Sequence, residues 1–268
     1  MPSLFSHLQR LLNTDARSRW IYDRLYYSPW ITRGCTYFNL GIAPVDPAVD
    51  AVVAPFERHQ AQVYHEIIKV LSALGACEPD RALEVGFGLG GGLKYLQGAL
   101  PTAAVLGIDL SRTAARRAQA LCNAPCAVAD AHHLPFAAAS FDLLVAVECL
   151  HKLDMARFFS QASLVLRNQG MACVADFRAA PFSAISQQVA QACTASGLIN
   201  RLSRELTDQV LQASADDHLR QQKILSRIPW GFRRWGRELM AMAGSERHAS
   251  FLTRQRCYFL HVAQKPAC

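Results

Sequence analysis

The chain has 268 residues, of which 51% are hydrophobic, and a formal net charge of +7. This length and composition support one main domain with a full apolar core. No run of about 18 uncharged apolar residues occurs, so we expect no transmembrane helix, and the first residues lack the pattern of a signal peptide. Nine scattered cysteines, an odd number, are typical of reduced thiols and predict a cytoplasmic protein. The positive charge is compatible with nucleic acid, phosphorylated substrates or a lipid surface and does not choose among them.

Residues 1–75 predict an N-terminal helical cap that ends in an aromatic loop. Leucines at helical spacing come first, and clustered aromatic residues follow: Leu4, Leu8, Leu11, Leu12, Trp20, Tyr22, Tyr26, Tyr27 and Trp30. Two interpretations of Tyr37, in the loop 36–41, stay open: it packs the cap onto the main domain, or it forms a lid over cofactor and substrate. Residues 46–58 carry two prolines and are interpreted as a linker. A helix from about residue 57 to 74 then leads into the main domain, residues 76–268.

A strand, a glycine loop and a helix follow one another in the stretch RALEVGFGLGGGL, residues 81–93. The apolar run 82–85 predicts a buried parallel strand, and the glycines allow positive φ angles and close approach of a ligand to the backbone. Such a loop holds a dinucleotide or S-adenosylmethionine, and the loop alone does not decide. Glu84 lies at the strand end, where its carboxylate would meet the cationic amino group of a methionine moiety and would repel a pyrophosphate.

Asp109 follows the next predicted strand, 104–108, and lies 23 residues after Gly86. A carboxylate near this spacing binds the ribose diol in nucleotide-binding folds, so we assign Asp109 to a ribose; the alternative is an ordinary cap for the helix at 112–121. Further strands are predicted at 126–129, 140–147 and 171–175, with a turn at 167–170 and helices at 91–99, 154–166 and 182–195. This alternation predicts an α/β fold with a parallel sheet.

These motifs resemble those of the class I S-adenosylmethionine-dependent methyltransferases. Motif I of that family, E/D-x-G-x-G-x-G, is matched by Glu84, Gly86, Gly88 and Gly90. The segments ADAHHLPF (129–136) and SFD (140–142) are similar to the family's second half, so the resemblance spans about residues 81–178. It implies that Asp130 accepts from the adenine amine and that backbone N–H groups of Ala131 or His132 bind the ring nitrogens. Leu110, His132 and Glu148 are expected to complete the cofactor pocket.

The same resemblance implies a Rossmann-like, seven-stranded, mostly parallel sheet of order 3-2-1-4-5-7-6 with helices on both faces. Its last strand, 256–263, is expected to be antiparallel, and a further strand is expected near 198–204. Residues 206–250 predict a C-terminal helical lid insertion that is basic and carries aromatic residues between its cations. We interpret it either as a solvated helix face or as a substrate lid that touches a membrane surface or an anionic substrate.

His151 follows the fourth strand, at the edge of the sheet where ligands bind in such folds. Its ordinary pKa near neutrality makes it the candidate general base, and the alternative is a cap for the next helix. Asp176, at the end of the neighbouring strand, is expected to hold the imidazole in one tautomer or to share the role. The scheme requires no metal. The N/D-P-P-Y motif of nucleic-acid amino-group methyltransferases does not occur, so no nucleic-acid partner is expected.

A looser resemblance points to the small-molecule and lipid methyltransferases near phthiotriol/phenolphthiotriol dimycocerosate methyltransferase. The shared features are the Y-F-N-L-G loop, the G-x-G-x-G-G-G loop, E-x-x-H after strand four and the helical insertion. It implies methyl transfer from S-adenosylmethionine to a hydroxyl oxygen of a small, largely apolar natural product or lipid-like acceptor. The alternatives are a cyclisation or rearrangement on the same cofactor, a nicotinamide-dependent oxidoreductase, and an RNA methyltransferase. The sequence leaves the oligomeric state open.

Overall fold

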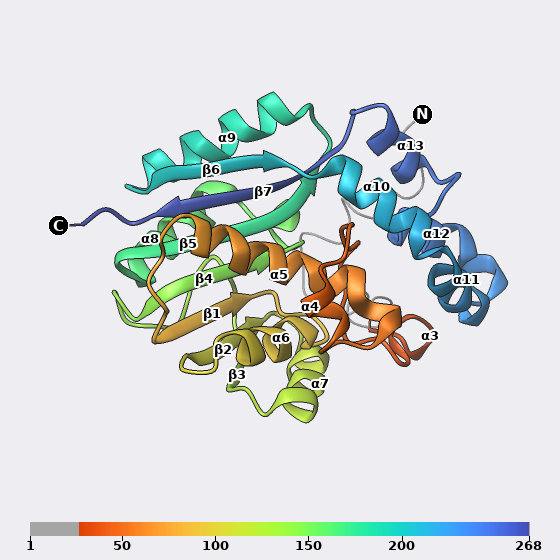
Figure 1. Ribbon diagram of the computed structural model, residues 1–268, viewed down its shortest axis with the longest axis horizontal. Coiled ribbons are helices and arrows are strands. Elements are labelled where there is room, and N and C mark those ends of the chain that lie inside the picture. The colour runs from red at the N-terminus through yellow and green to blue at the C-terminus, as the bar shows by residue number, and fades with distance from the viewer. Residues whose placement is uncertain (1–26, 268) are drawn as a thin grey trace.

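A seven-stranded sheet forms the centre of the computed structural model, which describes residues 27–267 (Figure 1). Its order is β3-β2-β1-β4-β5-β7-β6, as predicted. The strands are β1 (Arg81–Val85), β2 (Ala104–Asp109), β3 (Cys126–Val128), β4 (Phe141–Val147), β5 (Leu166–Arg178), β6 (Ile199–Glu205) and β7 (Cys257–Gln264). β1 to β5 pair in parallel, and β7 is antiparallel to both β5 and β6. The Rossmann-like fold class is confirmed.

Helices cover both faces of this sheet (Figure 1). The face under α5 and α6 and the face under α8 and α9 have separate apolar cores. The helices that flank the strands are α5 (Arg58–Ala73), α6 (Gly91–Ala99), α7 (Arg112–Cys122), α8 (Met155–Val165) and α9 (Phe182–Ala195). β4 serves both cores: Leu143, Val145 and Val147 pack on the first and Leu144 and Ala146 on the second. A strand buried on both faces needs a continuous apolar run, which is why β4 could be predicted from sequence.

The segment before β1 packs on the first core. Tyr37, Tyr64 and Ile67 are buried in the same apolar cluster as residues of β1 and α6. The predicted linker at 46–58 is wrong in detail, since it contains α4 (Pro47–Asp50) and the 3-10 helix η1 (Pro55–Glu57). Each of these begins with its proline, a position where the missing N–H costs nothing. The predicted leucine repeat at 4–12 and the aromatic residues Trp20, Tyr22 and Tyr26 lie outside the described residues, and the division at residue 75 stays a prediction.

The predicted turn at 167–170 is wrong, because these residues belong to β5. Gln169 adopts a positive φ of 65°, and the first part of β5 pairs with β4 with a register irregularity. The N–H of Gln169 donates to the carbonyl of Lys265, and the N–H of Lys265 donates to that of Gly170. Pairing with a segment almost 100 residues later therefore keeps this stretch in the sheet.

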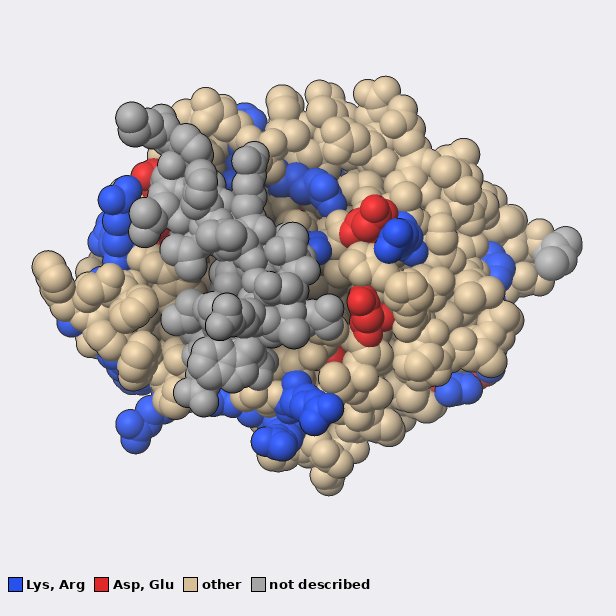
Figure 2. All heavy atoms as spheres, turned by 180° about the vertical axis from the view of Figure 1, so that it is seen from behind, with Lys and Arg blue, Asp and Glu red and all other residues tan. Residues whose placement is uncertain are grey.

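The C-terminal insertion is helical, as predicted, and lies at one end of the molecule (Figure 1). It consists of α10 (Thr207–Asp216), α11 (His218–Arg227), the 3-10 helix η3 (Trp230–Phe232), α12 (Arg233–Leu239) and α13 (Glu246–Leu252). The short helix α3 (Pro29–Thr32) packs against α11. Lys and Arg side chains gather around this end, at the left in Figure 2.

Candidate functional site

The predicted site residues converge on one edge of the sheet. Apart from Tyr37, each lies at or just after the carboxyl end of one of the strands β1 to β5: Glu84, Gly86, Gly88, Gly90, Asp109, Leu110, Asp130, Ala131, His132, Glu148, His151 and Asp176. Parallel pairing puts these strand ends side by side.

Glu84 is fully buried under the glycine loop. Its Oε1 accepts a hydrogen bond of 2.6 Å from the Tyr64 hydroxyl, whereas its Oε2 has no partner among the described residues. Burial raises the pKa of this carboxyl to about 8, and the charge of Asp109 adds to the effect. The glycine loop is packed tightly around it, because a Cβ at Gly92 would overlap Glu84 and one at Gly86 (φ +74°) would lie 2.8 Å from the Cβ of Cys149.

Asp109 ties the glycine loop to the end of β2. Its Oδ2 accepts from the N–H of Gly88 at 3.0 Å and its Oδ1 from the N–H of Ser111 at 2.8 Å. The cap of α7 is Ser111, whose hydroxyl accepts from the N–H of Ala114, so Asp109 is not that cap. The side chain of the adjacent Leu110 is 50% exposed and presents an apolar surface beside it.

Asp130 and His132 form a rigid turn after β3. The Oδ1 of Asp130 accepts from the backbone N–H of His132 at 2.9 Å and lies 2.8 Å from its Nδ1. The ring's Nε2 accepts from the N–H of Asp154 at 2.9 Å, so Nδ1 carries the proton. Partial burial raises the pKa of Asp130, but the hydrogen bonds from His132 outweigh it and hold that pKa below its ordinary value. The N–H of His132 is thus engaged with Asp130, and that of Ala131 is the better donor for a ligand.

The loop 35–41 lies over the glycine loop and is anchored at both ends. The carbonyl of Thr36 accepts from the N–H of Gly91 at 2.8 Å. Glu57, buried at the end of η1, accepts from the N–H groups of Thr36 and Tyr37 and from the Thr36 hydroxyl. Tyr37 is itself buried, and burial near Glu57 and Glu84 strongly raises its pKa. Glu57 was not predicted, because nothing in its sequence context marks it as a loop anchor.

Glu148 anchors the other end of this loop. It adopts a positive φ of 50°, and its Oε1 accepts from the N–H of Leu40 at 2.7 Å. Burial raises its pKa to about 8, partly offset by the Leu40 hydrogen bond. A left-handed glutamate is strained by about 1–3 kcal/mol, and such strain concentrates at functional sites.

His151 and Asp176 form a hydrogen-bonded pair. The Nδ1 of His151 lies 2.8 Å from the Oδ1 of Asp176, and the backbone N–H of His151 donates to the Oδ2 at 2.8 Å. Asp176 is fully buried, whereas the His151 side chain is 18% exposed. The imidazole stacks on Phe177, with ring centroids 4.5 Å apart. Burial lowers the pKa of His151, opposed by the Asp176 charge, so the ring is neutral at pH 7 and its Nε2 is the basic nitrogen. His151 does not cap α8, whose cap is Asp154.

A pocket opens from His151 toward α11. Half of its wall is apolar: Ile31, Cys35, Tyr37, Phe38, Leu40, Phe177, Ile224, Leu239 and Met240. The other half is polar or charged: Asn39, Gln60, Glu148, His151, Lys152, Asp217, Arg220, Gln221 and Arg247. Arg247 also lies over Phe177, with its guanidinium carbon 5.2 Å from the ring centroid. The cations near His151 depress its pKa further and favour negative charge on a ligand atom beside it.

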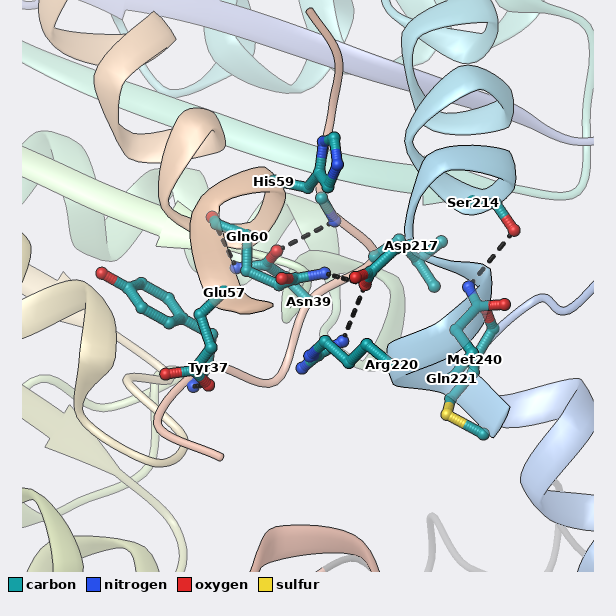
Figure 3. Close-up of polar contacts among 12 residues, drawn as sticks. Tyr37, Asn39, Glu57, His59, Gln60, Ser214, Asp217, Arg220, Gln221 and Met240 are labelled. Atoms are coloured by element: carbon teal, nitrogen blue, oxygen red, sulfur yellow. Dashed lines mark hydrogen bonds and ion pairs between the residues drawn. The ribbon is translucent and has the colours of Figure 1, made fainter. Parts of the chain in front are cut away.

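The far wall of the pocket is a buried polar cluster (Figure 3). Gln60 of α5 and Arg220 of α11 both donate to the Oδ2 of Asp217, at 3.1 and 3.0 Å. Gln221 donates to the Ser214 hydroxyl at 3.2 Å. The amide oxygens of Gln60 and Gln221 are buried without a partner among the residues described. The sequence did not predict this cluster, whose members come from helices far apart in the chain.

The cofactor that the sequence predicts fits this edge of the sheet. The Oε2 of Glu84, unpartnered among the described residues, would receive a cationic amino group, Asp109 would accept from a ribose diol, and Asp130 with the backbone N–H of Ala131 would bind an adenine. Within residues 27–267, no three His, Cys, Asp or Glu side chains are placed to hold a metal ion. None of the helices described has the length and apolarity needed to cross a membrane.

Comparisons with known proteins show the family of this chain. Residues 83–174 match the family model described as a methyltransferase domain. The chain is 31% identical over 223 residues to phthiotriol/phenolphthiotriol dimycocerosates methyltransferase 1 of Mycobacterium ulcerans (strain Agy99), covering 78% of this chain and 79% of that one.

Two solved structures share the fold. One is a putative sarcosine dimethylglycine methyltransferase from Galdieria sulphuraria (TM-score 0.73, 13% identity, 92% of this chain and 98% of that one). The other is a geranyl diphosphate methyltransferase in complex with S-adenosylmethionine (TM-score 0.64, 17% identity, 85% and 98%).

Proposed function

Since this chain belongs to the class I S-adenosylmethionine-dependent methyltransferases, in the lipid and small-molecule branch, we propose that it methylates a hydroxyl oxygen of its acceptor with His151 as general base. Its cofactor is S-adenosylmethionine, whose sulfonium supplies an activated methyl group. The protein then has to align the acceptor oxygen, exclude water and take up one proton. The observation that carries the proposal is the His151–Asp176 pair at the pocket wall.

The proton would move from the acceptor hydroxyl to the Nε2 of His151. Asp176 accepts from Nδ1–H and so keeps Nε2 unprotonated and fixed in orientation. The same carboxylate stabilises the imidazolium that forms, which makes Asp176 a positioning residue. Lys152 and Arg247, in the same wall, would stabilise the developing alkoxide. General bases of this kind contribute about 10²- to 10⁴-fold in rate.

The cofactor would be held by the residues at the ends of β1 to β4. Glu84 would bind the amino group and Asp109 the ribose diol of the cofactor. Asp130 and the backbone N–H of Ala131 would bind its adenine. The remaining residues of the site surround these groups: Tyr37, Gly86, Gly88, Gly90, Leu110, His132 and Glu148. We also propose a cytoplasmic location, because the cysteines are scattered and those in the described part of the chain form no disulfide.

The acceptor is proposed to be small, largely apolar and lipid-like. The Mycobacterium ulcerans relative is named for phthiotriol and phenolphthiotriol dimycocerosates, and half of the pocket wall here is apolar. The buried cluster of Gln60, Asp217, Arg220 and Gln221 would bind a polar group on the acceptor away from the reacting oxygen.

A labelled-methyl assay tests the proposal. Purified protein, S-adenosylmethionine carrying a tritiated methyl group, and a panel of long-chain alcohols, diols and amines would be incubated and the products extracted. We expect label in alcohols or diols, with turnover about 10²- to 10⁴-fold lower in His151→Gln. The exposed His218→Gln is the control and should match the wild type. Label only in amines, or equal turnover in His151→Gln, would contradict oxygen transfer with this base.

A further inference from the structure

The excess charge of the molecule is concentrated in one short segment. Residues 218–237 contain no Asp or Glu and six cations: Arg220, Lys223, Arg227, Arg233, Arg234 and Arg237. This segment therefore carries +6 of the net +7 of the chain, and the other residues are close to neutral. It forms α11, η3 and most of α12.

Large aromatic side chains are exposed on η3 and on the neighbouring helix α3. Trp230 is 86% exposed and Phe232 46%, and both belong to η3. Trp30 of α3 is 42% exposed, and its ring lies 6.2 Å from that of Phe232 although the two are 202 positions apart. Single exposed apolar residues are ordinary on proteins, but neighbouring exposed aromatic rings mark an interaction surface.

Cations flank these rings. Arg33, Arg233 and Arg234 are exposed within three positions of Trp30 or Phe232 in the chain, and Arg227 of α11 donates to the carbonyl of Arg33. Arg234 forms an exposed ion pair of 3.0 Å with Glu246, so the net positive charge of this surface comes from the other arginines. Trp30, Arg33, Trp230, Phe232, Arg233 and Arg234 are called the aromatic–basic face below.

The elements that carry this face also build the pocket. Ile31 follows Trp30 in α3 and lines the pocket, and Leu239 lines it from α12, the helix that begins with Arg233 and Arg234. The face is therefore the outer side of the helices whose inner side closes the pocket. A partner bound there would contact elements that also close the pocket.

We propose that the aromatic–basic face docks on an anionic lipid surface, with the rings of Trp30, Trp230 and Phe232 in the interfacial layer and the arginines on the headgroups. Tryptophan and arginine prefer that layer, where apolar rings are buried and charged ends stay hydrated. The positive charge of the face complements anionic lipids. Each cation near such a surface raises the affinity roughly fivefold. Nucleic acid fits less well, because bases stack on aromatic rings in a basic groove and Trp230 protrudes into solvent. This docking goes beyond the proposed function and can be measured without cofactor or acceptor.

Vesicle flotation with the full chain tests the proposal. The vesicles are phosphatidylcholine alone and phosphatidylcholine with about 30% phosphatidylglycerol, each at low and high salt. We expect binding to the anionic vesicles that weakens as salt rises. Arg233→Gln/Arg234→Gln should weaken it by about 30-fold, and Trp230→Ser/Phe232→Ser by at least as much. The control Leu164→Ser/Arg201→Gln removes one exposed apolar residue and one exposed cation from elements outside the face and should bind like the wild type.

Three outcomes would overturn the proposal. They are no preference for anionic over neutral vesicles, equal binding by the face variants and the control, and a stable dimer in light scattering that the face variants dissociate. Preferential capture of a fluorescent oligouridine over vesicles would assign the face to nucleic acid instead. Unchanged S-adenosylhomocysteine affinity in the variants would show that they are folded, so a loss of docking is separate from any failure of the methyl-transfer proposal.

Discussion

The Asp176 carboxylate is fully buried and accepts from both N–H groups of His151 and from the N–H of Phe177. It is thereby fixed in place, and its charge opposes the desolvation that lowers the pKa of His151. His151 acts as a base only when neutral. Activity should therefore fall as the pH drops through a midpoint below 6.5, the ordinary pKa of histidine.

Asp176→Asn should move that midpoint further toward acid, because the charge that raises the pKa of His151 is lost. It should also lower the turnover plateau by about 10²- to 10⁴-fold, since the imidazolium loses its counter-charge. A pH–rate profile of the methyl-transfer assay would measure both effects. A purely structural role for Asp176 would lower the plateau and leave the midpoint in place.

If Glu84 receives the amino group of the cofactor, as proposed, cofactor binding is linked to the protonation of Glu84. With a pKa of about 8, it is mostly protonated at pH 7, and a cationic amino group beside its unpartnered oxygen would lower that pKa. Binding of S-adenosylhomocysteine at pH 7 should then release up to about 0.9 proton from Glu84, and almost none at pH 9.5. Calorimetry in two buffers of different ionisation enthalpy measures the number of protons released on binding. In Glu84→Gln the protons that come from Glu84 should no longer be released. The same proton release in Glu84→Gln would mean that Glu84 does not receive the amino group.

At the scale of elements, two glutamates that come later in the chain, Glu57 and Glu148, hold the loop 35–41 in place. Glu57→Ala leaves two backbone N–H groups and a hydroxyl without their acceptor, which should cost about 1–3 kcal/mol in the free energy of unfolding. Because the loop contacts Gly91, the variant should also bind S-adenosylhomocysteine more weakly. Urea unfolding measures the free energy of unfolding, and calorimetry measures the affinity for S-adenosylhomocysteine. The control is Glu246→Ala, which removes an exposed carboxylate. Equal stability of the two variants would exclude an anchoring role for Glu57.

The sequence predicted the elements where local pattern and packing agree. β4 was predicted because its apolar run is buried on both faces, and the α6 bounds because glycines precede it. The turn at 167–170 was wrong because pairing with Lys265 keeps it in β5. The linker at 46–58 was wrong because its prolines begin short helices instead of breaking them.

In the candidate site, too, local pattern could be predicted from the sequence and long-range packing could not. Residues at strand ends could be predicted because parallel strands bring their carboxyl ends together. The pocket wall could not, since Gln60 and Asp217 are 157 positions apart and meet only through the packing of α5 against the insertion.

At the scale of the whole molecule, the buried carboxyls of Glu84 and Glu148 make the stability of the fold depend on pH. Glu84 and Glu148 have pKa values near 8 in the folded chain and near 4.5 when unfolded, so the folded state holds more protons between these values. Stability should therefore fall as pH rises from 6.5 to 8. The Tm of the ligand-free protein, measured over this range, should drop less in Glu84→Gln than in the wild type. Parallel curves for the two proteins would contradict the raised pKa of Glu84.

The proposed function separates a cofactor end, over β1 to β4, from an acceptor end, between His151 and the insertion. Calorimetric titration with S-adenosylhomocysteine of the wild type, Asp109→Ala and His151→Gln tests this separation most directly. We expect His151→Gln to bind like the wild type and Asp109→Ala to bind about 10- to 100-fold more weakly, because charge-assisted hydrogen bonds to the ribose are lost. Equal weakening in both variants, or no binding by the wild type, would contradict the account.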